Sequence, residues 1–375
     1  MDNTSSDPRA LRSDPPGEVA APSLPYQPQK PRNYEPKIGL IGCGGISSSH
    51  LQAYRNMGYD VVALCDTRRE AAEERRQEYY PQADVYTDYR ELLDRADVDV
   101  VDIATHLAQR TPLVRAALLA GKHVLSQKPF VSDLDVAEEL IDLAEQQGLK
   151  LAVNQNGRWA PYFSYLRQAC KAGILGDVCS IDIHVVWDHG WIKDTPFDAM
   201  HHVILYDFAI HWFDIVACLF GPASPSSVFA QVDRANNQEV APPLNAQVVV
   251  QYDSGHASLV FRGSTKWDPF ETIIVTGTEA TFRSTGPVCA NDNVTITNSD
   301  GQARAQLEGD WFPDGFAGTM GELLCAIEEG REPENSAKAN LRSLQLCFAA
   351  VESAEKGVPI CPDRVRRVDF EPGSD

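Results

Sequence analysis

The sequence lacks the features that would mark it for a membrane or for nucleic acid. No apolar run approaches the roughly 18 residues that a membrane-spanning helix needs, and no apolar signal segment precedes residue 36. Basic residues are scarce: 33 Lys and Arg stand against 53 Asp and Glu, for a net charge of −20. Because Lys and Arg clusters bind phosphate backbones and anionic lipids, we expect neither as a partner. We expect a soluble, cytoplasmic protein.

Paired cysteines are lacking as well. The nine cysteines are an odd number and form no CxxC pair. Several lie inside apolar runs, such as Cys65 in "VALCD" and Cys347 in "LQLCFAAV". This distribution is typical of buried free thiols in a reducing compartment and argues against a disulfide framework or a zinc cluster. We predict no metal site.

Three parts of the chain differ in texture. Residues 1–35 are rich in Pro and Ser without periodicity, which indicates either a disordered tail or an extended arm lying on a neighbouring subunit. Residues 36–156 alternate β-branched runs with helical stretches, which predicts a parallel sheet with helices on both faces. Residues 157–375 carry strand-like runs between 226 and 300 and a helix at about 203–220. We predict an α/β protein whose second domain has a large, mostly antiparallel open sheet that binds substrate and forms oligomers.

The stretch "PKIGLIGCGGISS" (36–48) joins a predicted strand to a predicted helix. Gly42 permits a tight turn, Gly44 lets the backbone approach a pyrophosphate, and Ser47 is small enough for close helix–strand packing. Asp66 ends the next strand, where an acid accepts hydrogen bonds from a ribose diol and favours NAD. Arg68 and its neighbour Arg69 could instead hold the 2′-phosphate of NADP. The alternative is a Gly-rich turn without a nucleotide.

Two further stretches carry groups suited to proton transfer. In "SQKPF", Lys128 lies at the carboxyl end of a predicted parallel strand, where ligands bind in open α/β sheets. Such a Lys can stabilise a developing alkoxide, although a solvated Lys in a turn fits the stretch equally. In "YDFAIHWFD", Asp207 and His211 are four residues apart and share one face of a predicted helix. His suits a general base near neutral pH, but its apolar neighbours also fit a core histidine.

Aromatic and polar residues cluster near these positions in the sequence. The stretches "NQNGRWAP" and "VVWDHGW" combine flat rings with amides and carboxylates, and two histidines precede the Asp207 helix. Such groups suit a sugar, whose C–H faces stack on rings while its hydroxyls are hydrogen-bonded; each Trp taken singly fits a core position. The candidate substrate contacts are Asn156, Arg158, Trp159, Trp187, Asp188 and His202.

Taken in order, "IGLIGCGGIS", the acid of "ALCD", "GKHVLSQKP" and "DFAIHWFD" resemble the glucose-fructose oxidoreductase / inositol dehydrogenase (Gfo/Idh/MocA) family over about residues 36–365. The resemblance implies a Rossmann domain with bound NAD(H) or NADP(H), and a second domain whose open sheet forms a homo-oligomer, a dimer or tetramer. It implies Lys128, Asp207 and His211 as the catalytic residues. The cofactor contacts that it implies are Gly42, Gly44, Gly45, Ile46, Asp66, Arg68, Thr105, His106, Gln127 and Lys128.

The sequence departs from the family pattern at three places. The usual acid before Lys-Pro is Gln127, which removes a charge next to Lys128. The common Pro-Asn after the fourth strand is His106-Leu107, and "HHVILY" replaces the glycines often found before the Asp-x-x-x-His helix. The catalytic residues are retained, while the substrate is harder to infer.

The function expected is an NAD-dependent dehydrogenase, with NADP possible, acting on a secondary alcohol of a sugar, glycoside or cyclic polyol. One alternative is a relative that retains its cofactor and cleaves glycosides through transient oxidation. Another is a non-catalytic, nucleotide-binding sensor on the same fold. A third, a zinc-dependent sugar isomerase, would use His184, His189, His201 and His202, but their spacing matches no metal motif and the glycine turn would be unexplained.

Overall fold

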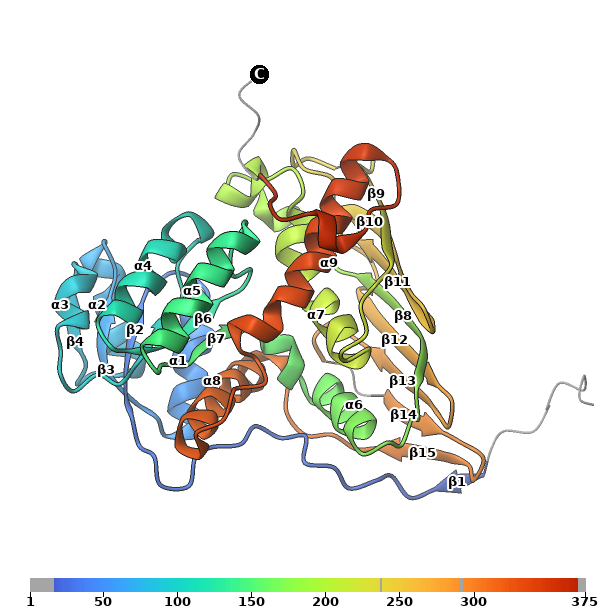
Figure 1. Ribbon diagram of the computed structural model, residues 1–375, viewed down its shortest axis with the longest axis horizontal. Coiled ribbons are helices and arrows are strands. Elements are labelled where there is room, and N and C mark those ends of the chain that lie inside the picture. The colour runs from blue at the N-terminus through green and yellow to red at the C-terminus, as the bar shows by residue number, and fades with distance from the viewer. Residues whose placement is uncertain (1–16, 237, 291–292, 370–375) are drawn as a thin grey trace, which may run out of the picture.

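The computed structural model describes residues 17–236, 238–290 and 293–369, which form two β-sheets and the helices that cover them (Figure 1). The first sixteen residues of the predicted arm lie outside the described residues. Among the described residues, no helix is long and apolar enough to cross a membrane. All nine cysteines are free thiols, as predicted, but only Cys43, Cys65, Cys325 and Cys347 are buried.

The first sheet has six parallel strands in the order β4-β3-β2-β5-β6-β7. Its central strands β2, β5 and β6 are buried along nearly their whole length, as expected of a parallel sheet covered on both faces. The predicted Rossmann fold is confirmed. The strands are β2 (Lys37–Ile41), β3 (Asp60–Cys65), β4 (Asp84–Tyr86), β5 (Val100–Ile103), β6 (His123–Gln127) and β7 (Leu151–Asn154). The helices are α1 (Ser47–Met57), α2 (Arg69–Tyr79), α3 (Tyr89–Leu93), α4 (Leu107–Leu119) and α5 (Leu134–Gln146).

The second sheet has nine strands in the order β1-β15-β14-β13-β12-β8-β11-β10-β9. It is mostly antiparallel, as predicted, but β8 runs parallel to β11 and β1 runs parallel to β15. The strands are β1 (Glu18–Val19), β8 (Val178–Val186), β9 (Ser227–Asp233), β10 (Asn245–Tyr252), β11 (Gly255–Arg262), β12 (Phe270–Gly277), β13 (Thr281–Gly286), β14 (Asn293–Thr297) and β15 (Gln302–Ala305).

Helices cover only one face of this second sheet (Figure 1). On the covered face lie α6 (Pro161–Lys171), α7 (Ile210–Leu219) and α9 (Ala337–Lys356), while α8 (Trp311–Glu329) packs against α1 of the first sheet. On the other face, Gln247, Val249 and Gln251 of β10 are exposed. The homo-oligomer expected through this face stays a prediction.

Residues 17–35 form an extended arm that lies on this same chain (Figure 1). The arm begins as β1 at the edge of the second sheet, where Glu18 pairs with Gln302. Further along, Tyr26 O accepts a hydrogen bond from Ser164 Oγ of α6 at 2.6 Å. The arm then crosses α8 and enters β2. The described part of the arm therefore connects the far edge of one sheet to the centre of the other.

One predicted helix differs from the observed one. The helix expected at 203–220 is interrupted: a π-helical turn covers Ile204–Phe208, and α7 begins only at Ile210. Apolar spacing does not reveal the extra residue of a π turn, because the neighbouring positions are apolar on all sides. The helix α5 is capped by Asp133, whose carboxylate accepts the N–H of Asp135.

Candidate functional site

The glycine turn lies between β2 and α1 and leaves open space in front of the helix N-terminus. Gly42 has a φ of +101°, and a Cβ there would meet the backbone carbonyl carbon of Ala104 at 2.9 Å. A Cβ on Gly44 or Gly45 would meet nothing within 4 Å. Ile46 precedes the first helical residue, Ser47. Free N–H groups of a helix start, with an open cradle before them, suit a pyrophosphate.

Asp66 follows β3 and stabilises the glycine turn through hydrogen bonds. Its Oδ2 accepts the N–H of Cys43 at 2.8 Å and its Oδ1 accepts the N–H of Arg68 at 2.9 Å. A cavity of about 240 Å³ opens beside the turn, lined by Gly44, Gly45, Arg68 and Arg75 among others. The carboxylate keeps lone pairs for a ribose diol, so these residues fit a dinucleotide.

Lys128 and Asp207 meet where the two parts of the chain face each other. Lys128 follows β6, and Asp207 belongs to the π turn of the second part. Lys128 Nζ donates to the backbone oxygen of Asp207 at 2.9 Å and to its Oδ2 at 3.1 Å. An ammonium has three donors, and the third has no partner among the described residues. It is left for an oxygen of a ligand.

His211 lies at the start of α7 and packs edge-on against Trp311, with ring centroids 5.2 Å apart. Its Nδ1 is buried and has no hydrogen-bond partner among the described residues. Burial, and then the positive charge of Lys128, hold the pKa of His211 well below its usual value. The imidazole is therefore neutral near pH 7 and able to accept a proton. Gly157 lies against its ring: a Cβ there would lie 3.6 Å from Nδ1.

The remaining predicted cofactor residues lie at neighbouring strand ends. Thr105 and His106 follow β5, and the His106 ring contacts Phe197 of the second part, with centroids 5.9 Å apart. Arg110 is buried in α4 and donates to the backbone oxygens of Thr105 and Pro129, which ties the ends of β5 and β6 together. The Gln127 side chain points away from this surface: it is 5% exposed and bonded within the protein.

Part of the predicted aromatic cluster is found beside Lys128. The His189 ring stacks on the Phe208 ring, with centroids 3.8 Å apart, and its centroid lies 4.9 Å from that of Trp187. Burial, helped by Lys128, lowers the pKa of His189 to about 3, so that this ring is an uncharged wall. Asp188 Oδ1 accepts the N–H of Gly190 at 3.0 Å and shapes the loop between them. Trp187 and Asp188 stay predicted substrate contacts.

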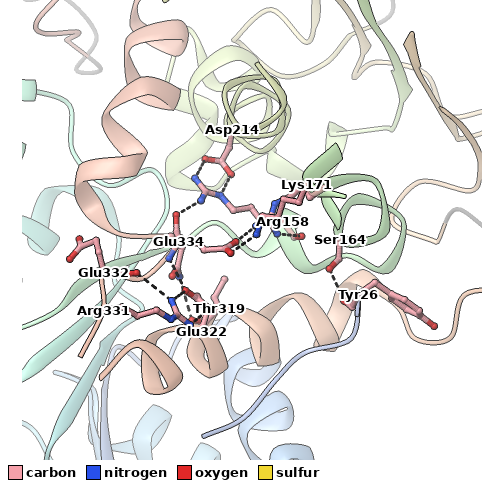
Figure 2. Close-up of polar contacts among 12 residues, drawn as sticks. Tyr26, Arg158, Ser164, Lys171, Asp214, Thr319, Glu322, Arg331, Glu332 and Glu334 are labelled. Carbon is pink, nitrogen blue, oxygen red and sulfur yellow. Dashed lines mark hydrogen bonds and ion pairs between the residues drawn. The ribbon is translucent and has the colours of Figure 1, made fainter. Parts of the chain in front are cut away.

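Three other predicted substrate contacts bind groups of the protein itself. Arg158 is 4% exposed, and its guanidinium binds both carboxylate oxygens of Asp214, at 2.6 and 2.7 Å (Figure 2). Asn156 Oδ1 accepts the Trp311 indole N–H at 2.7 Å, and Trp159 lies under the Arg167 guanidinium. All three side chains thus have partners within the protein, and their contact with substrate stays a prediction.

His202, the remaining predicted substrate contact, also has a partner within the protein. It is buried, and its Nε2 lies 3.2 Å from Glu355 Oε1 of α9, while burial lowers its pKa. Its ring therefore faces a helix of the same chain and not the Lys128 crevice. Among the described residues, no group of three or more His, Cys, Asp or Glu side chains could hold a metal ion.

Sequence reasoning missed two buried polar residues next to the site, Arg110 and His50. Nothing in the sequence distinguishes Arg110 from the partly exposed Arg115 of the same helix. For His50 a signal existed: Asp102 interrupts the β-branched run "VDVVDIAT", and a buried carboxylate requires a partner. His50 Nδ1 is that partner, 2.7 Å from Asp102 Oδ2.

Comparison with known proteins agrees with this geometry. A model described as "oxidoreductase family, NAD-binding Rossmann fold" (GFO_IDH_MocA) matches residues 36–155, and its "C-terminal alpha/beta domain" partner matches residues 167–361. The NAD-binding fold predicted from the glycine turn is thereby confirmed. A solved structure of an oxidoreductase from Agrobacterium radiobacter, in complex with NAD⁺, L-tartaric acid and magnesium, is similar with a TM-score of 0.79. It covers 88% of this chain and 99% of its own, but at 20% identity it shows the fold alone.

Three curated relatives are also similar to the chain. The D-apiose dehydrogenase of Paraburkholderia graminis is 28% identical over 338 residues, which cover 86% of this chain and 88% of the relative. The inositol 2-dehydrogenase of Rhizobium meliloti is 28% identical over 341 residues, covering 85% and 97%. A glycosyl hydrolase family 109 protein of a Shewanella species is 37% identical over 171 residues, covering 43% of this chain and 37% of the relative.

Proposed function

The chain belongs to the Gfo/Idh/MocA oxidoreductase family, and from this premise we propose that it is an NAD(P)-dependent dehydrogenase of a sugar, glycoside or cyclic polyol. The observation that carries the proposal is the meeting of Lys128, Asp207 and a neutral His211 at the carboxyl ends of the parallel strands. A charged donor beside an uncharged base is what removing a proton from a hydroxyl requires. Relatives that act on D-apiose and on inositol support this substrate class.

His211 and Lys128 divide the proton chemistry between them. Bound nicotinamide supplies the hydride acceptor, with Gly42, Gly44, Gly45 and Asp66 holding the dinucleotide. His211 takes the hydroxyl proton on Nε2, because Nδ1 is buried. Lys128 directs its third N–H to the same oxygen and stabilises the negative charge that develops there. Asp207 fixes the Lys128 ammonium through two hydrogen bonds, at 2.9 and 3.1 Å.

The dinucleotide preference follows from Asp66. Its carboxylate lies at the end of β3 and is braced by the Cys43 N–H, in the place where a ribose diol is accepted and a 2′-phosphate is repelled. We propose NAD as the preferred cofactor. The exposed Arg68 beside the cavity leaves NADP as the weaker substrate.

The test is a panel of sugars, glycosides and inositols, including D-apiose and myo-inositol, incubated with NAD⁺ or NADP⁺. The appearance of the reduced-nicotinamide absorbance would establish reaction, cofactor and substrate class together. No reduction across the panel, in protein shown to bind NAD⁺, would contradict the dehydrogenase assignment.

Variants of the proposed catalytic residues give the first prediction. His211→Asn and Lys128→Met should each lower kcat by about 10²–10⁴-fold, because each removes one half of the proton chemistry, while NAD⁺ affinity stays within a few-fold of wild type. The matched control is His201→Asn, which replaces an exposed histidine a few residues before the π turn. Full kcat in His211→Asn would show that another group is the base.

A second candidate function rests on the similarity to the glycosyl hydrolase family 109 protein. An enzyme of that kind would release a sugar from a glycoside without consuming added cofactor. The distinguishing observation is product without net nicotinamide reduction, from protein that yields NAD on denaturation. That result would replace the dehydrogenase proposal and keep the roles of Lys128 and His211.

A further inference from the structure

A buried polar cluster lies beneath Lys128, on the side away from the crevice. His50 comes from α1, Asp102 from β5 and Gln127 from the end of β6, and all three are at most 5% exposed. His50 Nδ1 lies 2.7 Å from Asp102 Oδ2, and His50 Nε2 lies 3.2 Å from Gln127 Nε2 and 3.2 Å from Asn154 Nδ2. Gln127 Oε1 in turn accepts the backbone N–H of Lys128 at 2.7 Å. The cluster thus runs without interruption from Asp102 to the main chain of the proposed catalytic Lys.

These contacts fix which atom of each pair in the cluster donates and which accepts. The Lys128 backbone N–H can only donate, so Oε1 of Gln127 faces it and the amide nitrogen of Gln127 faces His50. That amide nitrogen can only donate, so His50 Nε2 accepts and carries no proton. The imidazole proton is therefore on Nδ1, where it is donated to Asp102. The Lys128 N–H thus fixes the orientation of the Gln127 amide, and the amide fixes the tautomer of His50.

We propose that Asp102, His50 and Gln127 form a positioning chain that holds the backbone of Lys128, and so holds its ammonium against Asp207. The chain acts through Lys128 and touches no substrate. Each member positions the next: Asp102 orients the His50 ring, the ring orients the Gln127 amide, and the amide holds the Lys128 backbone N–H. At the next residue, the buried Arg110 donates to the backbone oxygen of Pro129, so the segment is held from two sides.

The chain also accounts for the glutamine that replaces the family's usual acid. A carboxylate at 127 would accept the Lys128 N–H equally well, but it could not donate to an unprotonated His50 Nε2. Gln127 donates on one side and accepts on the other, so it links His50 to the Lys128 backbone N–H, while Asn154 Nδ2 is a second donor that faces His50 Nε2. Gln127 therefore fits a His50 ring that carries no proton on Nε2.

The test compares two variants that break the chain with one that does not. Gln127→Met removes both hydrogen bonds at nearly constant length, and His50→Leu frees the amide. The control is Tyr54→Phe, which deletes a hydrogen bond of 2.6 Å to Asp102 Oδ2 in the same cluster but leaves the path to Lys128 intact. The inference rests on the proposed function, so kcat is measured on the sugar or polyol that the panel identifies.

Gln127→Met and His50→Leu should lower kcat by about 10²-fold, the cost of misplacing a reacting group by about 1 Å, with KM for NAD⁺ little changed. Tyr54→Phe should keep wild-type kcat, although its melting temperature should fall as much as those of Gln127→Met and His50→Leu. A merely structural role would instead lower stability in all three variants and leave kcat of the folded protein unchanged, which would overturn the proposal.

A second readout needs no substrate. The Lys128 amide should exchange with deuterium at least ten-fold faster in Gln127→Met than in wild type or Tyr54→Phe, as followed by NMR. Unchanged exchange would overturn the proposal, even if kcat fell, because the loss would not pass through Lys128. Lys128→Met separates the two ideas: if it keeps turnover, the proposed function fails, and if it alone loses turnover while Gln127→Met does not, only the positioning chain fails.

Discussion

At the scale of single residues, the type and spacing of some site residues indicate their role in the sequence. The role of others depends on which partners they contact in the folded protein. Lys128, Asp207 and His211 stand out in the sequence because their types and spacing suit proton transfer. The structure joins Lys128 to Asp207 and places His211 within reach of the Lys128 charge, while their catalytic role stays a prediction. Arg158 could not be interpreted from its neighbours. It looks like a sugar-binding residue in "NQNGRWAP", but its partner Asp214 lies far along the chain in α7. Local sequence carries no record of such a pairing.

The buried ion pair gives a prediction at this scale. Arg158→Met should lower the free energy of unfolding by about 3–5 kcal/mol, because Asp214, 1% exposed, would keep a charge with Ser343 Oγ as its main remaining partner. The double variant Arg158→Met with Asp214→Leu should regain much of that loss. Urea unfolding followed by tryptophan fluorescence measures both. A large rise in substrate KM in the folded double variant would support Arg158 as a substrate contact.

At the scale of elements, the strands and most helices follow from periodicity, while their irregularities do not. The run 203–220 is apolar on every side, so its pattern predicts one helix and conceals the π turn that presents Asp207 to Lys128. The strand β12 conceals a second irregularity. Glu271 lies on it fully buried, where alternation would place an apolar residue, and accepts hydrogen bonds from Trp212 Nε1 at 2.6 Å and Tyr162 OH at 2.8 Å.

Glu271 makes stability depend on pH. Burial raises the pKa of this carboxyl to about 7, against 4.5 for a free one, and its two neutral hydrogen-bond donors offset only part of the effect. The folded state holds the proton more tightly, so this contribution is complete below pH 4.5 and is lost as the pH rises to about 7.

Glu271→Gln, which stays neutral, should remove that loss. Relative to wild type, the variant should gain up to about 3 kcal/mol of stability between pH 5 and pH 8. Urea titrations of both proteins at the two pH values measure the difference. If wild type and variant changed in parallel with pH, Glu271 would not be the titrating group.

At the scale of the whole molecule, the N-terminal arm joins the two sheets. Its most concentrated contact is with Glu328 of α8, whose carboxylate accepts the backbone N–H groups of Arg32, Asn33 and Tyr34 at 2.8, 2.7 and 2.9 Å. These bonds lower the pKa of Glu328. The sequence offered a disordered tail or an arm on a neighbouring subunit. Composition cannot say where an extended segment lies, because its backbone binds and its side chains carry no periodic pattern.

Close contact between the arm and α8 gives the last prediction. A Cβ on Gly321 would lie 2.0 Å from the backbone oxygen of Gln29. Gly321→Ala should therefore displace the arm, at a cost of about 1–3 kcal/mol, and speed trypsin cleavage after Arg32. The control is Gly17→Ala, because a Cβ at Gly17 meets nothing within 4 Å. Equal cleavage rates in the two variants would mean that the arm is not held by α8.

The pairing of β1 with β15 has a consequence for the order of assembly on the ribosome. Glu18 leaves the exit tunnel well before its partner Gln302, which follows only after the whole Rossmann domain and most of the second sheet. Closing so long a loop is entropically the most expensive pairing of the sheet, so it forms last. The arm is therefore synthesised before the strand that it pairs with, and it docks only after that strand has been made.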